Sequence, residues 1–433
     1  MRESTKRAAH IARVLTRHGL GYLVDVTGLE HLVRRHTHRG DSRGPEHLRQ
    51  ALEELGPTFV KLGQLLSTRA DLIPPAYEAE LTRLQDSAAP VPFSTVARSV
   101  EAALGRPIGA AFSRFDREPL AAASIGQVHA AALPDGSEVA VKVRRPRIAH
   151  QIDEDLELLR RLAAVAERRW PLADRYDPVG LADEFATTLR GELDYEREGA
   201  SADRIRSELA VGAGVHVPRV HWDRTTTEVL TLERVSGRKI TDVEGLDADG
   251  LDRTGVARTF CDMYIQMVFV HGFFHADPHP GNVFVQGDGT LALVDYGMVG
   301  QVDDATRRSL GAVLVALAIA DADGLAAAMS DLGVAPPRDD ATALRNDLAE
   351  FMATYRHATL EELQLRVILG DMLAVVRRHH LRLPHQLALL LKTVTTCEGV
   401  ALQLDPRFEL LPLLIPYAAM LQQPSTLQHP LAE

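Results

Sequence analysis

Apolar residues recur at intervals of three and four over the first hundred residues, for example in AAHIARVLTRHGLGYLV and PTFVKLGQLLSTRA. Such spacing gathers them on one face of a helix, so residues 8–104 are expected to be mostly helical. Pro74 and Pro75 predict the end of the helix that contains the KLGQ segment. The polar stretch at 34–45 ends in Gly-Pro and predicts a linker within this helical region.

The periodicity changes to two from about position 106. IGQVHAAAL and EVAVKV flank the turn sequence PDGS, and two strands joined in this way predict a hairpin. In the second strand, alternation places Lys142 on the face opposite three valines. Helical segments are expected at 150–170 and 178–209, and two more strand-like runs occupy 216–222 and 228–235.

Beyond position 240 the pattern is mainly helical, with a long apolar helix expected at 251–270. The loop HADPHPGN and a second hairpin, VFV-QGDG-LALVDYG, interrupt it before helices fill 303–421. The order of elements predicts an α+β chain with three parts. These are a helical extension at 1–105, a small sheet lobe at 106–235 and a larger helical lobe at 236–433.

Composition excludes several classes of protein. Apolar residues at 45% and charged residues at 25% exclude a disordered chain. Two cysteines exclude a disulfide scaffold, and a net charge of −11 argues against a nucleic-acid-coating protein. The first residues lack the apolar core of a signal peptide, and the apolar runs at 310–320 and 410–421 are too short or contain proline. A cytoplasmic location is therefore expected.

The charge is unevenly distributed along the chain. The first fifty residues contain ten Lys/Arg and five Asp/Glu, a local charge of +5. A solvated helical face is the favoured interpretation of this basic segment. The alternative is peripheral contact with an anionic membrane surface on the cytoplasmic side.

Three oxygen-bearing side chains surround the second hairpin. Asp277 precedes Asn282 by five residues, and Asp295 lies thirteen residues further on. The hairpin should bring Asn282 and Asp295 together, where amide and carboxylate oxygens suit Mg²⁺. Asp277 could orient or deprotonate a hydroxyl. This is the arrangement of protein-kinase-like phosphoryl transfer, and the alternative is a turn-forming Asp-Pro loop with an Asx-capped strand end.

Lysine is scarce in this chain, which has five lysines against 43 arginines. Lys142 in VAVK therefore suggests a role that arginine cannot fill, such as contact with the α- and β-phosphates of a nucleotide. Glu192, Asp194 and Glu198 in GELDYEREGA are expected on one helix, where their mutual repulsion indicates a nearby cation. A solvent-facing lysine and a solvated acidic face are the alternatives.

The glycine-rich loop of ordinary protein kinases is missing. Before Lys142 the chain reads PLAAASIGQVH, in which only Gly126 permits close backbone approach to phosphate. The three preceding alanines restrict the backbone where glycine would free it. An ordinary protein kinase is therefore disfavoured.

The motifs AAASIGQVH, VAVKV, ELDYERE, HADPHPGN and VDYG, in this order and preceded by FVKLGQLLSTRADLIPP, resemble the UbiB/AarF family of atypical kinase-like proteins. The resemblance implies a protein-kinase-like two-lobe fold with a helical extension. It also implies a Lys-x-Gly-Gln helix that packs over the active site, an acidic motif that contacts this helix, and an alanine-rich loop that changes nucleotide selectivity. The corresponding residues are Lys61, Gly63 and Gln64 of the helix, Glu192 and Asp194 of the acidic motif, and Ala121, Ala122, Ala123 and Ser124 of the loop.

The remaining roles follow from the same resemblance. Glu198 would pair with Lys142, Glu233 would occupy the hinge that meets the adenine, and Asp277 would be the catalytic aspartate. Asn282 and Asp295 would hold the metal, next to Tyr296 in the position of the usual phenylalanine. Several family members end in two membrane-spanning helices, for which the segment after 410 is expected to be too short.

These observations predict a Mg²⁺-dependent atypical kinase or ATPase that uses ATP or ADP. The acceptor would be water or a lipid hydroxyl, such as that of a prenylated quinone precursor, and homodimers are expected from the family. A non-catalytic nucleotide-gated pseudokinase and a protein Ser/Thr kinase are the alternatives. A zinc hydrolase built on His271, His275 and His279 is disfavoured because prolines break the helix they would need.

Overall fold

The computed structural model describes residues 3–29, 44–84, 88–171, 173–209, 214–334, 341–355 and 364–421. The chain forms two compact units. The first unit contains residues 1–199 and 220–234, and the second contains residues 200–219 and 235–433. Most of the linker predicted at 34–45 lies outside the described residues. The predicted division into three parts stays a prediction.

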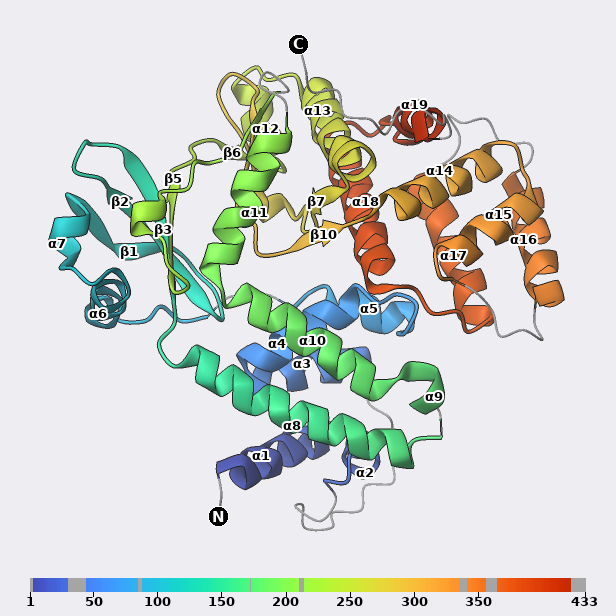
Figure 1. The fold of residues 1–433 in the computed structure, drawn as a ribbon, viewed down its shortest axis with the longest axis horizontal. Coiled ribbons are helices and arrows are strands. Elements are labelled where there is room, and N and C mark those ends of the chain that lie inside the picture. Colours follow the sequence, from blue (N-terminus) through green and yellow to red (C-terminus); the bar gives the residue numbers. More distant parts are fainter. Residues whose placement is uncertain are drawn as a thin grey trace. The chain divides into compact units, whose positions relative to one another are not determined.

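Helices make up most of the first unit (Figure 1). In chain order they are α1 (Glu3–Arg17), α2 (Gly21–Val26), α3 (Pro45–Leu55), α4 (Pro57–Ser67), α5 (Pro75–Leu81), α6 (Phe93–Leu104), α7 (Ile108–Ala111), α8 (Ile148–Arg169), α9 (Ala173–Tyr176), α10 (Pro178–Glu192) and the start of α11 (Tyr195–Glu208). Four of them, α3, α4, α5 and α10, begin with proline. Proline suits this position because its φ is already helical and its missing N–H would have no partner there.

A core of aliphatic side chains joins α1, α3, α4, α5 and α8. Asp155 of α8 lies within it with 1% of its side chain exposed, and Arg7 of α1 pairs with this carboxylate at 2.7 Å. Thr58 at the start of α4 donates a hydrogen bond to the same carboxylate at 2.8 Å. A buried carboxylate is costly unless it is paired and hydrogen-bonded, so these contacts fix α1 and α4 against α8.

The sheet of the first unit is antiparallel, in the order β1-β2-β3-β5. Its strands are β1 (Arg114–Ala122), β2 (Gly126–Ala132), β3 (Glu138–Arg144) and β5 (Val229–Glu233). The three valines of β3 are buried in a core shared with α6 and α7, while Lys142 points to the other face. The predicted hairpin and the predicted alternation along β3 are confirmed.

The second unit combines short strands with long helices (Figure 1). Its strands form two sheets, ordered β4-β9-β8-β6 and β10-β7. They are β4 (Val215–His216), β6 (Arg238–Lys239), β7 (Phe273–His275), β8 (Val283–Val285), β9 (Leu291–Leu293) and β10 (Val299–Gln301). Its helices after α11 are α12 (Val243–Ala248), α13 (Arg253–Gln266), α14 (Asp304–Ala318), α15 (Ala322–Asp331), α16 (Ala341–Tyr355), α17 (Leu365–Arg378), α18 (His385–Leu404) and α19 (Leu411–Leu421). The predicted α+β fold is confirmed.

Within the described ranges, one helix is long and apolar enough to cross a membrane. This is α18, with 20 residues and a mean hydropathy of 1.3, and 56% of the segment is buried inside the second unit. It packs along α13, and its Glu398 accepts hydrogen bonds from the backbone N–H groups of Leu365 and Arg366 at 2.8 and 2.6 Å. A helix that is mostly buried and also caps a neighbour has the properties of a core helix.

Candidate functional site

Lys142 and Glu198 form a close ion pair in the first unit. Lys142 extends from β3, and its Nζ lies 2.8 Å from both carboxylate oxygens of Glu198 on α11. The exposed fractions of the two side chains are 18% and 3%. The ring of Tyr195, 5.2 Å from Nζ, adds a cation–π contact. The predicted pairing is therefore present, and the ammonium is held in one position.

Tyr195 also explains why residue 126 is glycine. A Cβ at Gly126 would lie 2.2 Å from the Tyr195 hydroxyl and 3.0 Å from the carbonyl oxygen of Val143. Packing against Tyr195 thus requires glycine here, whereas the sequence suggested close approach to phosphate. The assignment of Gly126 to nucleotide binding stays a prediction.

The alanine-rich loop is a short turn between β1 and β2. Ala121 and Ala122 still belong to β1, where they pair with Val128 and Gln127 of β2. The Ala123 N–H donates a hydrogen bond to the carbonyl of Gly126 at 2.8 Å, and Ser124 is buried. The loop proper is therefore only residues 123–125, and its backbone is fixed by the strands on both sides.

Lys61 of α4 contacts the predicted acidic motif. Its Nζ lies 2.7 Å from Glu192, with exposed side-chain fractions of 14% and 11%. Asp194 has a different partner, because its carboxylate accepts the backbone N–H of Glu196 at 3.1 Å. The predicted contact of Lys61 is thus confirmed for Glu192, and Asp194 caps the start of α11.

The expectation of one helix through Glu192, Asp194 and Glu198 is wrong. Helix α10 ends at Glu192 and α11 begins at Tyr195. The interruption lets the Asp194 side chain satisfy a backbone N–H that has no partner within the helix. Each of the three acids consequently has a separate contact.

Gly63 and Gln64 face the helical part of the first unit. A Cβ at Gly63 would lie 2.3 Å from a methyl group of Leu84 and 2.8 Å from one of Leu52. Gln64 donates a hydrogen bond from Nε2 to the carbonyl of Leu84 at 3.2 Å. In the structure these two residues pack α4, whereas Lys61 forms the ion pair with Glu192 of the acidic motif.

The second unit holds the predicted catalytic aspartate and metal ligands, Asp277, Asn282 and Asp295. The Asn282 amide nitrogen donates to the Asp277 carboxylate at 2.9 Å and to its carbonyl at 3.2 Å. The backbone carbonyl of Asn282 accepts the Val294 N–H at 2.9 Å, so the β8–β9 hairpin does place Asn282 beside the residue before Asp295. Because the amide nitrogen of Asn282 donates its hydrogen bonds to Asp277, the amide oxygen can act as a metal ligand. Together with the Asp295 carboxylate it fits the oxygen ligands that Mg²⁺ prefers.

His275 joins these residues, and the sequence interpretation missed this. It is fully buried, with Nε2 2.7 Å from the carbonyl oxygen of Asp295 and Nδ1 3.3 Å from the backbone nitrogen of Asp277. A backbone N–H can only donate, so Nδ1 accepts and Nε2 carries the proton. Asp295 has φ of 62°, an uncommon value outside glycine, and the contact with His275 helps to hold it.

No group of three His, Cys, Asp or Glu residues that could hold a metal ion occurs in the part of the chain that the structure describes. Of the three histidines considered for zinc, His275 bridges Asp277 and Asp295, and His279 accepts the Gly281 N–H. A signal for the real role of His275 was its place between Phe274 and Ala276, in a buried strand directly before the acidic loop.

Glu233 is the last residue of β5, where it pairs with Val139. The chain leaves the first unit after Arg234. This position at the end of the last strand agrees with a connecting segment between the two units. The predicted contact of Glu233 with adenine stays a prediction.

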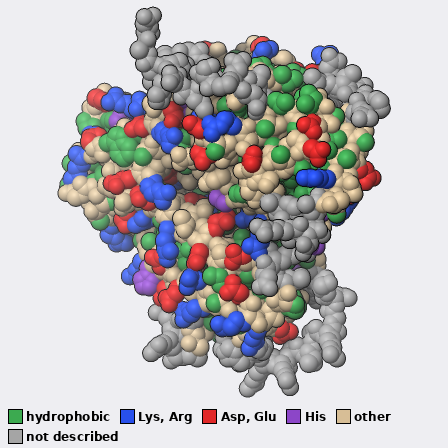
Figure 2. Space-filling view, turned by 45° about the vertical axis from the view of Figure 1, so that its right-hand side comes forward, with side chains coloured by type: hydrophobic (Ala, Val, Ile, Leu, Met, Phe, Trp, Pro, Cys, Tyr) green, Lys and Arg blue, Asp and Glu red, His purple; other side chains and the backbone are tan. Residues whose placement is uncertain are grey.

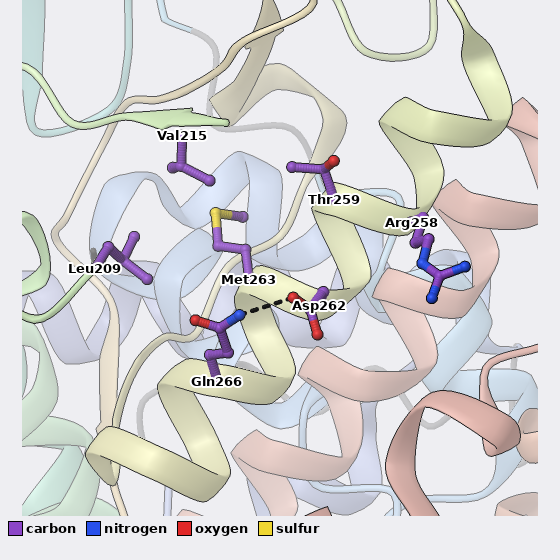
Figure 3. A pocket seen from close by; sticks show the side chains of 7 residues that line it. All are labelled: Leu209, Val215, Arg258, Thr259, Asp262, Met263 and Gln266. Atoms are coloured by element: carbon purple, nitrogen blue, oxygen red, sulfur yellow. Dashed lines mark hydrogen bonds between the residues drawn. The ribbon is translucent and has the colours of Figure 1, made fainter. Parts of the chain in front are cut away.

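A cavity of about 160 Å³ lies in the second unit (Figure 3). The described residues that line it include none of the predicted site residues; they are Leu209, Val215, Arg258, Thr259, Asp262, Met263 and Gln266. Asp262 is already held by Gln266 at 2.7 Å and by the Tyr417 hydroxyl at 2.9 Å. Burial and this carboxylate raise the pKa of Tyr417 to about 12. The cavity therefore carries no separate catalytic constellation.

Comparison with known proteins agrees with these features. The sequence matches the ABC1 atypical kinase-like domain over residues 83–329 and the UbiB helical domain over residues 348–409. A probable protein kinase UbiB from Xylella fastidiosa is 39% identical over 419 residues, covering 93% of this chain and 76% of that protein. One from Xanthomonas axonopodis pv. citri is 39% identical over 424 residues with the same coverage. The structure of the Rv3197–erythromycin complex from Mycobacterium tuberculosis is similar with a TM-score of 0.58 at 25% identity, covering 84% of this chain and 92% of that chain.

Proposed function

Because the chain belongs to the UbiB/ABC1 family of atypical kinase-like proteins, we propose that it binds ATP or ADP with Mg²⁺ and hydrolyses ATP or transfers its phosphoryl group. The observation that carries the proposal is the ion pair of Lys142 with both carboxylate oxygens of Glu198. In kinase-like phosphoryl transfer, a lysine held in this way positions the phosphates. The relatives from Xylella fastidiosa and Xanthomonas axonopodis are named as probable protein kinases, which supports the same class of reaction.

Each group in the second unit has a role under this proposal. Asn282 and Asp295 would hold Mg²⁺, which neutralises negative charge on the phosphates when bound. Asp277, 2.9 Å from the Asn282 amide, would orient the attacking oxygen and accept its proton. His275 keeps the backbones of Asp277 and Asp295 in register.

The proposed acceptor is water or the hydroxyl of a lipid, such as a prenylated quinone precursor, at the cytoplasmic face of a membrane. The apolar face of α1 is buried in the first unit, where Ile11 and Val14 have 2% and 0% of their surface exposed. Contact with an anionic surface would therefore be made by the basic side chains of the first fifty residues rather than by this apolar face.

Turnover of ATP in the presence of Mg²⁺ and anionic vesicles tests the proposal. Asp295→Asn is expected to reduce turnover at least a hundredfold, because it removes a charged oxygen ligand. Asp288→Asn is the matched control, since Asp288 is exposed at the tip of the same hairpin and accepts the Thr290 N–H. Equal turnover by the two variants would contradict the assigned role of Asp295.

A nucleotide-gated protein without turnover is the second candidate function. It is favoured by the Lys61–Glu192 ion pair, which ties α4 to the segment leading into α11, the helix that bears Glu198. Nucleotide contact at Lys142 could then alter the position of α4. Nucleotide binding without turnover of ATP by the wild type would favour this candidate. Transfer of phosphate to a peptide would instead favour a protein Ser/Thr kinase.

A further inference from the structure

The alanine-rich loop is attached to a neighbouring segment, Ala88–Pro92, which we call the strap. The Ala88 N–H donates a hydrogen bond to the carbonyl of Ala122 at 3.1 Å, on one side of the loop. The Val91 N–H donates to Oε1 of Gln127 at 2.8 Å, on the other side. The strap thus contacts the chain on both sides of residues 123–125.

Arg145 contacts the loop and the strap at the same time. It directly follows β3, three residues after Lys142. Its Nε donates to the carbonyl of Ala123 at 2.8 Å, and its Nη2 donates to the carbonyl of Ala89 at 2.8 Å. Its backbone N–H also donates to the carbonyl of Ile125 at 2.9 Å. Charge-assisted bonds are the stronger kind, and the planar guanidinium fixes the two carbonyls relative to each other.

Gln127 and His129 complete the attachment beneath the loop. Both are buried, and Nε2 of Gln127 lies 2.7 Å from Nε2 of His129. His129 Nδ1 lies 2.9 Å from the carbonyl of Asp116, which can only accept, so Nδ1 donates and Nε2 accepts from Gln127. Burial lowers the pKa of His129, which keeps the ring neutral as this arrangement requires. The Gln127 amide oxygen is thereby directed to Val91.

We propose that Arg145 is a positioning residue that holds the alanine-rich loop in a single conformation against the strap, and that this conformation sets nucleotide affinity. The second half rests on the proposed function, since it assumes that a nucleotide binds at this loop. The strap follows Leu84, whose carbonyl accepts from Gln64 of α4. The helix with the Lys-x-Gly-Gln motif is thus bonded to Leu84, and the loop is bonded to the strap.

The expected effect on affinity follows from populations. A ligand that binds one conformer has an apparent Kd equal to its intrinsic Kd divided by the fraction of that conformer. If removal of the guanidinium lowers the competent fraction to roughly one tenth, the apparent Kd rises roughly tenfold. The proposal gives Arg145 no part in the transfer step, so turnover at saturating nucleotide should change much less than affinity.

Amide hydrogen exchange of the nucleotide-free protein tests the structural half directly. Arg145→Gln is expected to speed exchange in a peptide covering residues 119–126 roughly tenfold, because the loop opens locally more often. Arg98→Gln is the matched control, because Arg98 is exposed on α6 and donates a hydrogen bond to its neighbour Thr95 at 3.2 Å. Arg145→Lys keeps the positive charge but loses the planar guanidinium with its two donor nitrogens. The exchange rate of the loop in this variant should therefore lie between the rates in Arg145→Gln and Arg98→Gln. Arg145→Lys also serves as the reporting variant if Arg145→Gln does not fold.

Titration with a fluorescent ADP analogue and Mg²⁺ tests the functional half in the same proteins. Higher Kd for Arg145→Gln, with Arg98→Gln like the wild type, supports the proposal. The proposal is overturned if the loop exchanges equally fast in Arg145→Gln and in Arg98→Gln. It is also overturned if Arg145→Lys shows the slow loop exchange of the wild type, because lysine lacks the planar guanidinium to which that slow exchange is assigned. If the wild type binds no nucleotide, the proposed function fails, and the exchange data alone decide whether Arg145 holds the loop.

Discussion

Burying the charge of Lys142 or of Glu198 without its partner would lower the stability of the first unit. The Glu198 side chain is 3% exposed, and the two Nζ–oxygen distances are both 2.8 Å. Desolvation offsets much of the attraction in a buried pair, so the pair itself adds little stability. Removing the Glu198 charge is different, since it takes away a carboxylate that balances the Lys142 ammonium in a mostly buried place.

Glu198→Gln is therefore expected to lower the free energy of unfolding by about 3 kcal/mol. It should also reduce turnover, because Lys142 loses the group that fixes it. Chemical denaturation beside Glu196→Gln, an exposed acid two residues away, provides the measurement and the control. Equal stability of the two variants would show that, in Glu198→Gln, the Lys142 ammonium is hydrated or bonded to another acceptor.

Gly126 and Tyr195 make a second prediction at this scale. Gly126→Ala should destabilise the protein by about 1–3 kcal/mol, since its methyl group meets the Tyr195 hydroxyl. Removing that hydroxyl in Tyr195→Phe leaves the nearest ring carbon 3.5 Å from the new Cβ. The double variant should recover most of the loss, as thermal unfolding of the four proteins in the cycle would reveal. Additive losses would mean that the methyl group clashes with the Val143 carbonyl instead.

Sequence reasoning at the residue scale found the charged partners and missed the groups that orient them. The resemblance to the UbiB/AarF family implied the pairing of Lys142 with Glu198, and the scarcity of lysine and the cluster of acids agreed with it. His275 and Arg145 form hydrogen bonds with backbone carbonyls. Every residue has a carbonyl, so the amino-acid sequence does not indicate which carbonyl a side chain will contact. Their roles depend on which backbone segments fold side by side.

At the scale of elements, the boundary between α10 and α11 decides which acid meets which base. The sequence there contains no proline, and its glycine precedes the break, so continuous helix was the natural prediction. The structure places buried Leu193 and the capping Asp194 between the helices. Because the helix is interrupted, Glu192 faces α4 while Glu198 faces β3.

The Lys61–Glu192 contact should measurably couple α4 to the end of α10. In a double-mutant cycle of Lys61→Met and Glu192→Gln, we expect a coupling of about 1 kcal/mol, since both side chains are mostly buried. The cycle Arg17→Met and Glu54→Gln is the control, because that pair is 60% and 33% exposed and should couple by less than about 0.5 kcal/mol. Urea unfolding of each variant gives the two coupling energies. Equal coupling in the two cycles would contradict the prediction that the Lys61–Glu192 pair couples more strongly than the exposed Arg17–Glu54 pair.

For the whole molecule, the order of lobes was predictable because periods of two and of three to four are visible in the sequence. The helices of the C-terminal region were predicted only as one long run, since their alanine-rich surfaces give few boundaries. Acidic and basic side chains are interspersed over the face drawn in Figure 2. In the basic first fifty residues, Arg7, Arg17 and Arg49 all pair with acids. Three of the ten Lys/Arg side chains in the first fifty residues are thus compensated within the first unit.

Helix α18 has a consequence for how the chain is made. Its apolar length would suit insertion into a bilayer, yet it carries Glu398, whose carboxylate caps α17. An ionisable residue within an inserting segment costs on the order of 2–3 kcal/mol at the translocon. The Glu398 carboxylate thus disfavours insertion of α18 into a bilayer during synthesis. In the folded chain it stabilises the packing of α18 against α17. Glu398 and Lys392 are the two Asp/Glu/Lys/Arg residues of α18, and each adds to the cost of moving this helix into a bilayer.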